Sequence, residues 1–347
     1  MHKPSINLFR TPLASLICLA AGFFAPAARP AESAQYHVSA RYAIGGAGSY
    51  DYIRLDPETR RLFVSHQTRV EVIDADSGRM EGSITGLRGV HGIALAKDLK
   101  RGFITNGLDG TVTVFDLATL QVLDTIRTAG DKPDAIEYDP STQLVFVSNG
   151  HSNNATLIDA KTGAIVRMIA LAGNPESIAF DGRGHALVNL ESHSSIAQVE
   201  LASGRVLADW PLSPGENPTG LAIDRVSRRL FASCGGNQKL VVLDADGGRV
   251  IAVLPIGDDS DGAAFAPATR RVFSSNRDGT LTVIQEDDAD HFRVIASVPT
   301  QFGAKTLAVD PDKDRIYLPV ATLGKGADED HPGPAVPGTF RVLVVTP

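Results

Sequence analysis

A short hydrophobic run with polar residues on both sides recurs seven times along the 347-residue chain. The central positions of these runs are 63, 103, 146, 187, 231, 273 and 317, so the steps between them are 40, 43, 41, 44, 42 and 44 residues. A second run rich in valine and isoleucine follows in most repeats, as in Val70-Glu71-Val72-Ile73-Asp74. Runs of this kind predict β-strands, and a period of this length is typical of a four-stranded propeller blade. We therefore predict an all-β chain folded as a seven-bladed β-propeller with four-stranded antiparallel blades.

The segments between these runs contain residues that favour tight turns. Asp56-Pro57-Glu58-Thr59 places proline at the second turn position, where its fixed φ is suitable, and positions 139–142 and 310–313 repeat the pattern. Asp74-Ala75-Asp76-Ser77-Gly78 ends in glycine, which adopts the positive φ of a hairpin bulge. These turns support a chain of short strands.

The last repeat provides three strands instead of four. We place them near Thr306–Asp310, Arg315–Val320 and Thr339–Val345. The segment His37–Ile44 precedes the first repeat and has no partner there. Since an unpaired edge strand is a liability, we predict that this N-terminal strand closes the last blade. The propeller would then form a single domain over residues 35–347 with both ends ordered.

The second strands of several repeats also carry a recognisable four-residue element. It occurs as Phe103-Ile104-Thr105-Asn106, Phe146-Val147-Ser148-Asn149 and Phe273-Ser274-Ser275-Asn276. The pattern resembles the YVTN-repeat (YncE-like) seven-bladed β-propellers and, more distantly, the lactonase-type propellers. The resemblance covers nearly all of the chain after the N-terminal segment. It implies the fold and leaves the function open, because this scaffold hosts many activities.

The N-terminal segment has the three parts of a secretory signal peptide. Lys3 and Arg10 make the start basic, 13–24 is apolar, and Ala25-Pro26-Ala27 is a small-residue exit. The apolar run is too short to span a bilayer. We predict a cleaved signal peptide over 1–27, with Ala31 or Ala34 as other cleavage positions, and a periplasmic or secreted protein. A buried N-terminal helix is the alternative interpretation.

The net charge and the cysteine count limit which partners and crosslinks are expected for the chain after signal-peptide removal. Removal of residues 1–27 takes away Lys3 and Arg10 and no acid, so the formal charge changes from −7 to −9. An acidic chain without a basic run offers no electrostatic footprint for nucleic acid. Cys234 is the one cysteine left, so an internal disulfide is impossible. We expect a monomer that does not insert into a membrane after the signal peptide is removed.

Two sets of positions are expected to face one mouth of the central channel. The first set precedes the inner strands and consists of Asp51, His91, Asp134, Glu176, Thr219, Asp261 and Lys305. The second set ends the second strands and consists of His66, Asn106, Asn149, Leu190, Cys234, Asn276 and Val320, with His151, Glu191 and His193 nearby. One interpretation is a solvated polar rim. The other is a binding surface, because crowded carboxylates favour a bound cation or shifted pKa values. Its polar members would contact the ligand: Asp51, His66, His91, Asn106, Asp134, Asn149, Glu176, Glu191, Asp261, Asn276 and Lys305.

A divalent metal is the cofactor that these residues suggest. His66 and His91 come from adjacent blades, and Asp51 and Asp134 lie beside them, which makes a nitrogen–oxygen set for zinc or a similar ion. No pair has the close spacing of a metal motif such as H-E-x-x-H. Cys234 is expected to be a small lining thiol, since acidic neighbours disfavour a thiolate.

Two classes of function follow from the residues, and the family resemblance also allows a third, a structural role in a surface layer. The chain is expected to bind a small molecule or a protein at the polar mouth of its channel. The alternative is an enzyme, either a metal-assisted hydrolase or lyase or a lactonase-like propeller that uses the acids and histidines of the mouth. The loop 321–338, with Asp328-Glu329-Asp330-His331, is longer than its counterparts and is either a lid over this mouth or an acidic flap.

Overall fold

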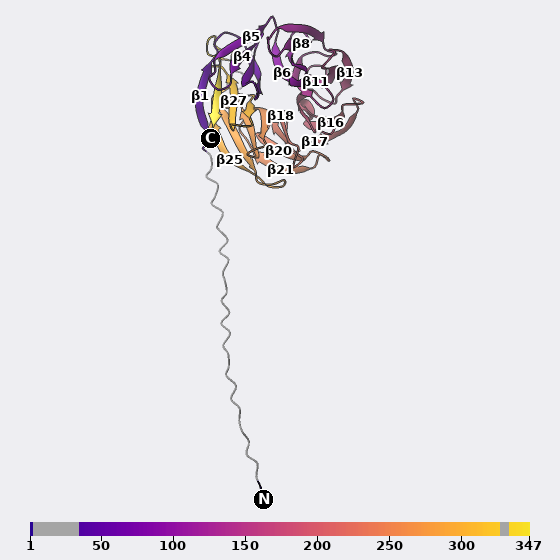
Figure 1. The fold of residues 1–347 in the computed structure, drawn as a ribbon, viewed down its shortest axis with the longest axis vertical. Helices are drawn as coiled ribbons and strands as arrows, with labels where there is room; N and C mark the ends of the chain where they lie inside the picture. Colours follow the sequence, from indigo (N-terminus) through magenta and orange to yellow (C-terminus); the bar gives the residue numbers. More distant parts are fainter. Residues whose placement is uncertain (3–34, 327–332) are drawn as a thin grey trace. The chain divides into compact units, whose positions relative to one another are not determined.

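Seven four-stranded antiparallel sheets follow one another around a central channel (Figure 1). The computed structural model describes residues 1–2, 35–326 and 333–347, and Ala34–Pro347 form one compact unit. Except for its first two residues, the predicted signal peptide lies outside the described residues. The inner strands of successive blades contact each other around the ring. The predicted all-β, seven-bladed propeller is confirmed.

Within a blade, the strands run outwards from the channel. The first blade consists of β2 (Tyr50–Asp56), β3 (Arg61–His66), β4 (Arg69–Asp74) and β5 (Met80–Thr85), and the second of β6 (Val90–Ala96), β7 (Arg101–Asn106), β8 (Thr111–Asp116) and β9 (Val122–Arg127). The third consists of β10 (Pro133–Asp139), β11 (Leu144–Asn149), β12 (Asn154–Asp159) and β13 (Ile165–Ala170), and the fourth of β14 (Pro175–Phe180), β15 (His185–Leu190), β16 (Ser195–Glu200) and β17 (Val206–Pro211).

The fifth blade consists of β18 (Pro218–Asp224), β19 (Arg229–Cys234), β20 (Lys239–Asp244) and β21 (Val250–Pro255), and the sixth of β22 (Ser260–Ala266), β23 (Arg271–Asn276), β24 (Thr280–Glu286) and β25 (Phe292–Pro299). Two short 3₁₀ helices occur in the described part of the chain, η1 (Lys97–Leu99) and η2 (Glu191–His193). No helix within the described residues has the length and hydropathy to cross a membrane.

The seventh blade joins the two ends of the propeller. It consists of β26 (Ala308–Asp310), β27 (Arg315–Val320), β28 (Arg341–Thr346) and, on the outside, β1 (His37–Ala43). The indigo β1 lies beside the yellow end of the chain (Figure 1). It pairs antiparallel with β28 from His37↔Thr346 to Ala43↔Arg341. The predicted closure by the N-terminal strand is therefore confirmed.

The recurring hydrophobic run forms the core between blades. Its central side chains are at most 1 % exposed: Phe63, Phe103, Phe146, Leu187, Phe231, Phe273 and Tyr317. The second and third strands are covered on both faces by neighbouring blades, which is why their central residues are continuously buried instead of alternating between buried and exposed. Each outer strand is largely exposed, and in β9 only Ile126 is buried.

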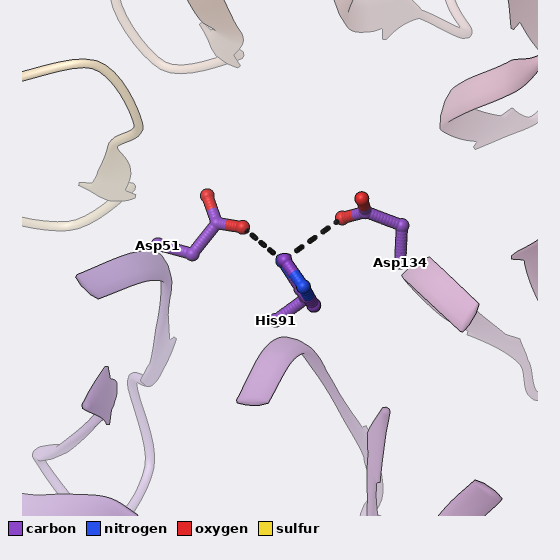
Figure 2. A group of neighbouring side chains, drawn as sticks. All are labelled: Asp51, His91 and Asp134. Carbon is purple, nitrogen blue, oxygen red and sulfur yellow. Dashed lines mark hydrogen bonds and ion pairs between the residues drawn. The ribbon is translucent and has the colours of Figure 1, made fainter. Parts of the chain in front are cut away.

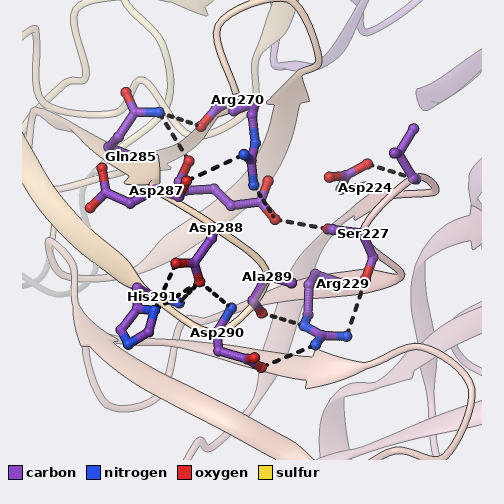
Figure 3. A network of polar contacts seen from close by, with 12 residues as sticks. Asp224, Ser227, Arg229, Arg270, Gln285, Asp287, Asp288, Ala289, Asp290 and His291 are labelled. Atoms are coloured by element: carbon purple, nitrogen blue, oxygen red, sulfur yellow. Dashed lines mark hydrogen bonds and ion pairs between the residues drawn. The ribbon is translucent and has the colours of Figure 1, made fainter.

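A polar network on the face opposite the predicted mouth ties the fifth blade to the sixth (Figure 3). Arg229 donates from Nε to the carbonyl of Ala289 at 2.5 Å and from Nη2 to Asp290 at 3.2 Å. The hydroxyl of Ser227 donates to the buried carboxylate of Glu286 at 2.8 Å. These bonds pair polar groups at the blade junction, except for Oε2 of Glu286, which is buried without a hydrogen-bond partner.

Candidate functional site

A β-bulge at the start of the inner strand positions most residues of the first set. In the first blade the pairing moves from Tyr50↔His66 to Ile53↔Val64, so that Asp51 lies in the extra length of β2. The same irregularity places five more residues of the set: His91, Asp134, Glu176, Thr219 and Asp261. A bulge redirects a side chain out of the alternation of the strand. Lys305 reaches the same ring from the loop before β26.

Hydroxyl groups from neighbouring blades hold the backbone of this ring. In each case the donor is a serine or threonine and the acceptor is the carbonyl of a ring residue one blade further on. The pairs are Thr105 to Asp134 (2.6 Å), Ser148 to Glu176 (2.7 Å), Ser275 to Lys305 (2.5 Å) and Thr306 to Asp51 (2.6 Å). The blades therefore fix the ring residues relative to one another.

Three side chains from consecutive blades meet at the channel mouth. Figure 2 shows the imidazole of His91 between the carboxylates of Asp51 and Asp134. The Nδ1 atom of His91 lies 2.6 Å from Oδ2 of Asp51 and 3.5 Å from Oδ1 of Asp134. Lys305 contacts Oδ1 of Asp51 at 3.2 Å and Asp261 at 2.9 Å. Lys132 contacts Oδ2 of Asp134 at 3.2 Å. We call Asp51, His91 and Asp134 the acid–histidine cluster.

The charges of the cluster shift its pKa values in different directions. Burial alone would raise the pKa of Asp51, but Lys305 and His91 outweigh it and lower this pKa to about 2. Burial lowers the pKa of His91, yet the hydrogen bond to Asp51 and the charge of Asp134 produce a net rise. The pKa of Asp134 is raised by its burial and by repulsion from Asp51. Asp51 is therefore the permanent anion that orients the imidazole.

The other half of the mouth holds a carboxylate with a different environment. Burial and repulsion from Asp134, Asp261 and Glu191 raise the pKa of Glu176 well above its ordinary value. No lysine or arginine within the described residues forms an ion pair with Glu176. Tyr52 lies close to the same carboxylates, and burial followed by the charges of Asp134 and Glu176 raises its pKa. The carboxylates near Glu176 are thus less neutralised by basic side chains than those of the acid–histidine cluster.

Two cavities adjoin the ring. The central channel beneath it has a volume of about 400 Å³, and its lining includes Tyr52, Ser177 and Asp261. A groove of about 520 Å³ lies on the other side of His91 and is lined by Lys132, His151 and other residues. A ligand at the mouth would therefore have room both in the channel and in the groove.

The second set of predicted residues is buried, and the expectation that it faces the mouth is wrong. Asn106, Asn149 and Asn276 are at most 2 % exposed. Each donates to threonine hydroxyls of its own blade, as Asn106 does to Thr113 at 2.9 Å. Leu190, Cys234 and Val320 are buried as well. These positions end regular strands without a bulge, so their side chains stay in the packing between strands.

His66 is the member of this set for which the correction matters most. Its side chain is fully buried and packs against Phe340 with ring centroids 4.5 Å apart and the rings tilted by 42°. Its Nδ1 atom lies 3.4 Å from Glu71 and 3.3 Å from Arg69. The structure does not include His66 in the acid–histidine cluster, so the predicted His66–His91 centre is replaced by Asp51, His91 and Asp134.

The remaining candidates lie around the mouth. Glu191 begins η2, accepts a hydrogen bond from Asn174 at 2.6 Å and is close enough to Glu176 to raise its pKa. His151 lines the groove, whereas His193 contacts Asp209 at 3.5 Å. Burial raises the pKa of Cys234 to about 12, which disfavours a nucleophilic thiolate, and the buried side chain does not line the channel as predicted.

The long loop folds back on itself where it is described. Leu323 and Ala335 form an isolated antiparallel bridge, and the amide of Gly338 donates to the carbonyl of Gly46 at 2.5 Å. The acidic segment 328–331 lies outside the described residues. The described parts of the loop pack on the seventh and first blades through Leu323 and Ala335.

Lys132 and Tyr52 contribute to the mouth but are not among the residues predicted from the sequence. A signal for Tyr52 exists, because the residue after the ring position is small in the other six blades: Gly92, Ala135, Ser177, Gly220, Gly262 and Thr306. A large aromatic at this position has to enter the channel. Lys132 has no such signal, since its side chain reaches the ring from the loop before the strand.

The geometry supports two kinds of chemistry. An imidazole whose Nδ1 is bound by a carboxylate has its other nitrogen free for proton transfer. Two carboxylate oxygens and one imidazole nitrogen are also donors that divalent transition metals accept.

Comparison with known proteins supports the fold. No family model matches the chain. A stretch of 173 residues is 26 % identical to antigen Lp49 of Leptospira interrogans, and it covers 48 % of this chain and 38 % of that protein. The chain therefore matches less than half the length of this relative.

Three solved structures are similar over most of the chain. Hydrazine synthase from Kuenenia stuttgartiensis has a TM-score of 0.69 at 20 % identity, with 80 % of this chain and 93 % of that chain covered. The WD40 repeats of RRP9 have a TM-score of 0.77 at 10 % identity, with 90 % of this chain and 99 % of that chain covered. The structure of U3-55K has a TM-score of 0.74 at 9 % identity, with 88 % of this chain and 97 % of that chain covered. The fold is a seven-bladed β-propeller. At these identities the likeness carries the fold alone, and the YVTN-repeat assignment stays a prediction.

Proposed function

We propose that this propeller is an exported binding protein that takes a small polar ligand at the mouth of its central channel. A seven-bladed propeller is a scaffold for binding ligands or partners. The observation that carries the proposal is the ring of charged residues, which the bulges and inter-blade hydrogen bonds hold above a cavity of about 400 Å³.

The chemistry of the mouth indicates the class of ligand. The acid–histidine cluster is neutralised by Lys132 and Lys305, whereas no lysine or arginine in the described part of the chain forms an ion pair with Glu176. A buried carboxylate in this setting gains from a hydrogen-bond donor or a positive group. We therefore propose a ligand that presents hydroxyl or ammonium groups to Glu176, with Tyr52 beneath it in the channel.

Replacement of Glu176 by glutamine is expected to weaken this ligand selectively. Amino acids, amines and sugars would be screened by thermal shift with the mature chain, and hits measured by calorimetry in buffer with and without divalent metal. Loss of a hydrogen bond to a charged group costs about 1.5–3 kcal/mol, so affinity should fall about 10-fold or more. Glu216→Gln is the control, because Glu216 is exposed in the loop before β18. Binding that is equal in the wild type and Glu176→Gln, or no binding by any of the three classes, would refute the proposal.

Export is the second part of the proposal, supported by the basic, apolar and small-residue segments of 1–27. N-terminal sequencing of the protein from an envelope or secreted fraction should find a start between Ala27 and Ala34. Protein that keeps Met1 and stays in the cytoplasm would contradict it.

A further inference from the structure

The acid–histidine cluster places three side-chain atoms that can bind a metal close to one another. Within the described residues, Asp51, His91 and Asp134 are the one group of three such side chains whose donor atoms all lie within 4.8 Å of one another. In a shell with bonds of about 2.1 Å, neighbouring donor atoms lie about 3–3.5 Å apart. The observed separations of 2.6 Å and 3.5 Å around Nδ1 of His91 differ from this by less than an ångström. Binding of the ion through Nδ1 would release to solvent the proton that Nδ1 donates to Asp51.

Lys305 and Lys132 each bind one oxygen of a cluster aspartate and leave its other oxygen available to a metal ion. Lys305 binds Oδ1 of Asp51 and Lys132 binds Oδ2 of Asp134. The other oxygen of each carboxylate faces His91 (Figure 2). Outer partners that fix one oxygen and aim the other are what metal-binding carboxylates require.

The charge of the mouth also suits a dication. Asp51, Asp134, Glu176 and Asp261 are opposed by two lysines, Lys132 and Lys305. The mouth thus holds four carboxyl groups and two lysines, an excess of acidic side chains that favours a bound cation. Since such charges are partly buried here, their neutralisation is worth more than it would be in water.

We infer that Asp51, His91 and Asp134 form a binding site for a divalent transition-metal ion at the channel mouth. One nitrogen and two oxygen donors match Zn²⁺ or Mn²⁺, whereas Ca²⁺ takes six to eight oxygen ligands. Three protein ligands leave coordination positions open towards the mouth. The inference deepens the proposed function by naming one occupant of the same mouth, and it involves a different half of the ring from Glu176.

The test uses the mature chain stripped by a chelator and titrated with Zn²⁺, Mn²⁺ or Ca²⁺ alone in a calorimeter. We expect one Zn²⁺ or Mn²⁺ per chain and Ca²⁺ binding at least about 10-fold weaker. His91→Gln and Asp134→Asn, each checked for folding by circular dichroism, should lower the affinity by about 10-fold or more, because each removes one of three ligands. His185→Gln is the matched control, since its Nδ1 also lies on an aspartate (Asp181, 2.9 Å) but away from the channel.

Each outcome decides the inference. Binding without stoichiometry, binding that is unchanged in both cluster variants, or a preference for Ca²⁺ would overturn it. If the metal fails to bind while the Glu176-dependent ligand does, the proposed function stands without the metal. If the metal binds and no ligand of the screened classes does, the metal site stands and the proposed ligand falls.

Discussion

A chain of residues 45–347 should unfold at clearly lower denaturant concentration than one of residues 35–347, and it should self-associate. The deletion removes β1, whose pairing with β28 runs from His37 to Ala43. It also removes Tyr36, which donates a hydrogen bond to Asp314 at 2.7 Å and packs on Phe273. Truncation of a buried aromatic side chain alone typically costs about 3–5 kcal/mol. The bare edge of β28 would in addition present unpaired backbone groups to other chains.

The measurements are urea unfolding and gel filtration. The control is Tyr36→Ala, which loses the anchor but keeps β1 over the edge of β28. We expect the single variant to be destabilised and monomeric, and the deletion to be destabilised further and to associate. A deletion that unfolds like the chain of residues 35–347 and stays monomeric would show that β1 does not close the ring.

Gly220→Ala should be strongly destabilising, because the inner strands of the fifth and sixth blades approach each other at this residue. A Cβ atom here would lie 2.4 Å from the amide nitrogen of Ala263 and 2.5 Å from the carbonyl carbon of Gly262. These are backbone atoms of the next blade, and closed blades on both sides prevent that strand from moving away. Overpacking of this kind costs about 1–3 kcal/mol, and occasionally more.

Gly247→Ala is the matched control for this substitution. Its Cβ would meet only a side-chain oxygen of Asp244, at 3.8 Å. Surface changes of this type usually stay within about 0.5 kcal/mol of the wild type. Denaturant unfolding of the two variants should therefore separate clearly. Equal free energies of unfolding for both would mean that the blades can spread at the channel.

The fold could be predicted from the sequence because each blade repeats the same local pattern. Phe63 and its six counterparts recur at nearly constant spacing, and the short apolar run around each of them is needed because blades cover both of its faces. The segment 37–44 has no partner in the first repeat, and the last repeat lacks one strand. Pairing of the two was therefore predictable from the sequence. These are properties of spacing and composition, which the sequence displays directly.

The site was only half determined by the sequence, and the physical reason is the direction of side chains. Asp51, His91 and Asp134 could be selected by their position before the inner strands. The same alignment placed His66 and Asn106 at the mouth, but in the structure they end regular strands and remain buried. A bulge decides which residue leaves the strand alternation, and it depends on pairing with another strand. Likewise, the contacts of Lys132 and Lys305 with two aspartates join different blades. The sequence by itself determined the ring of blades and its closure, whereas the tertiary structure decided which polar residues point into the channel.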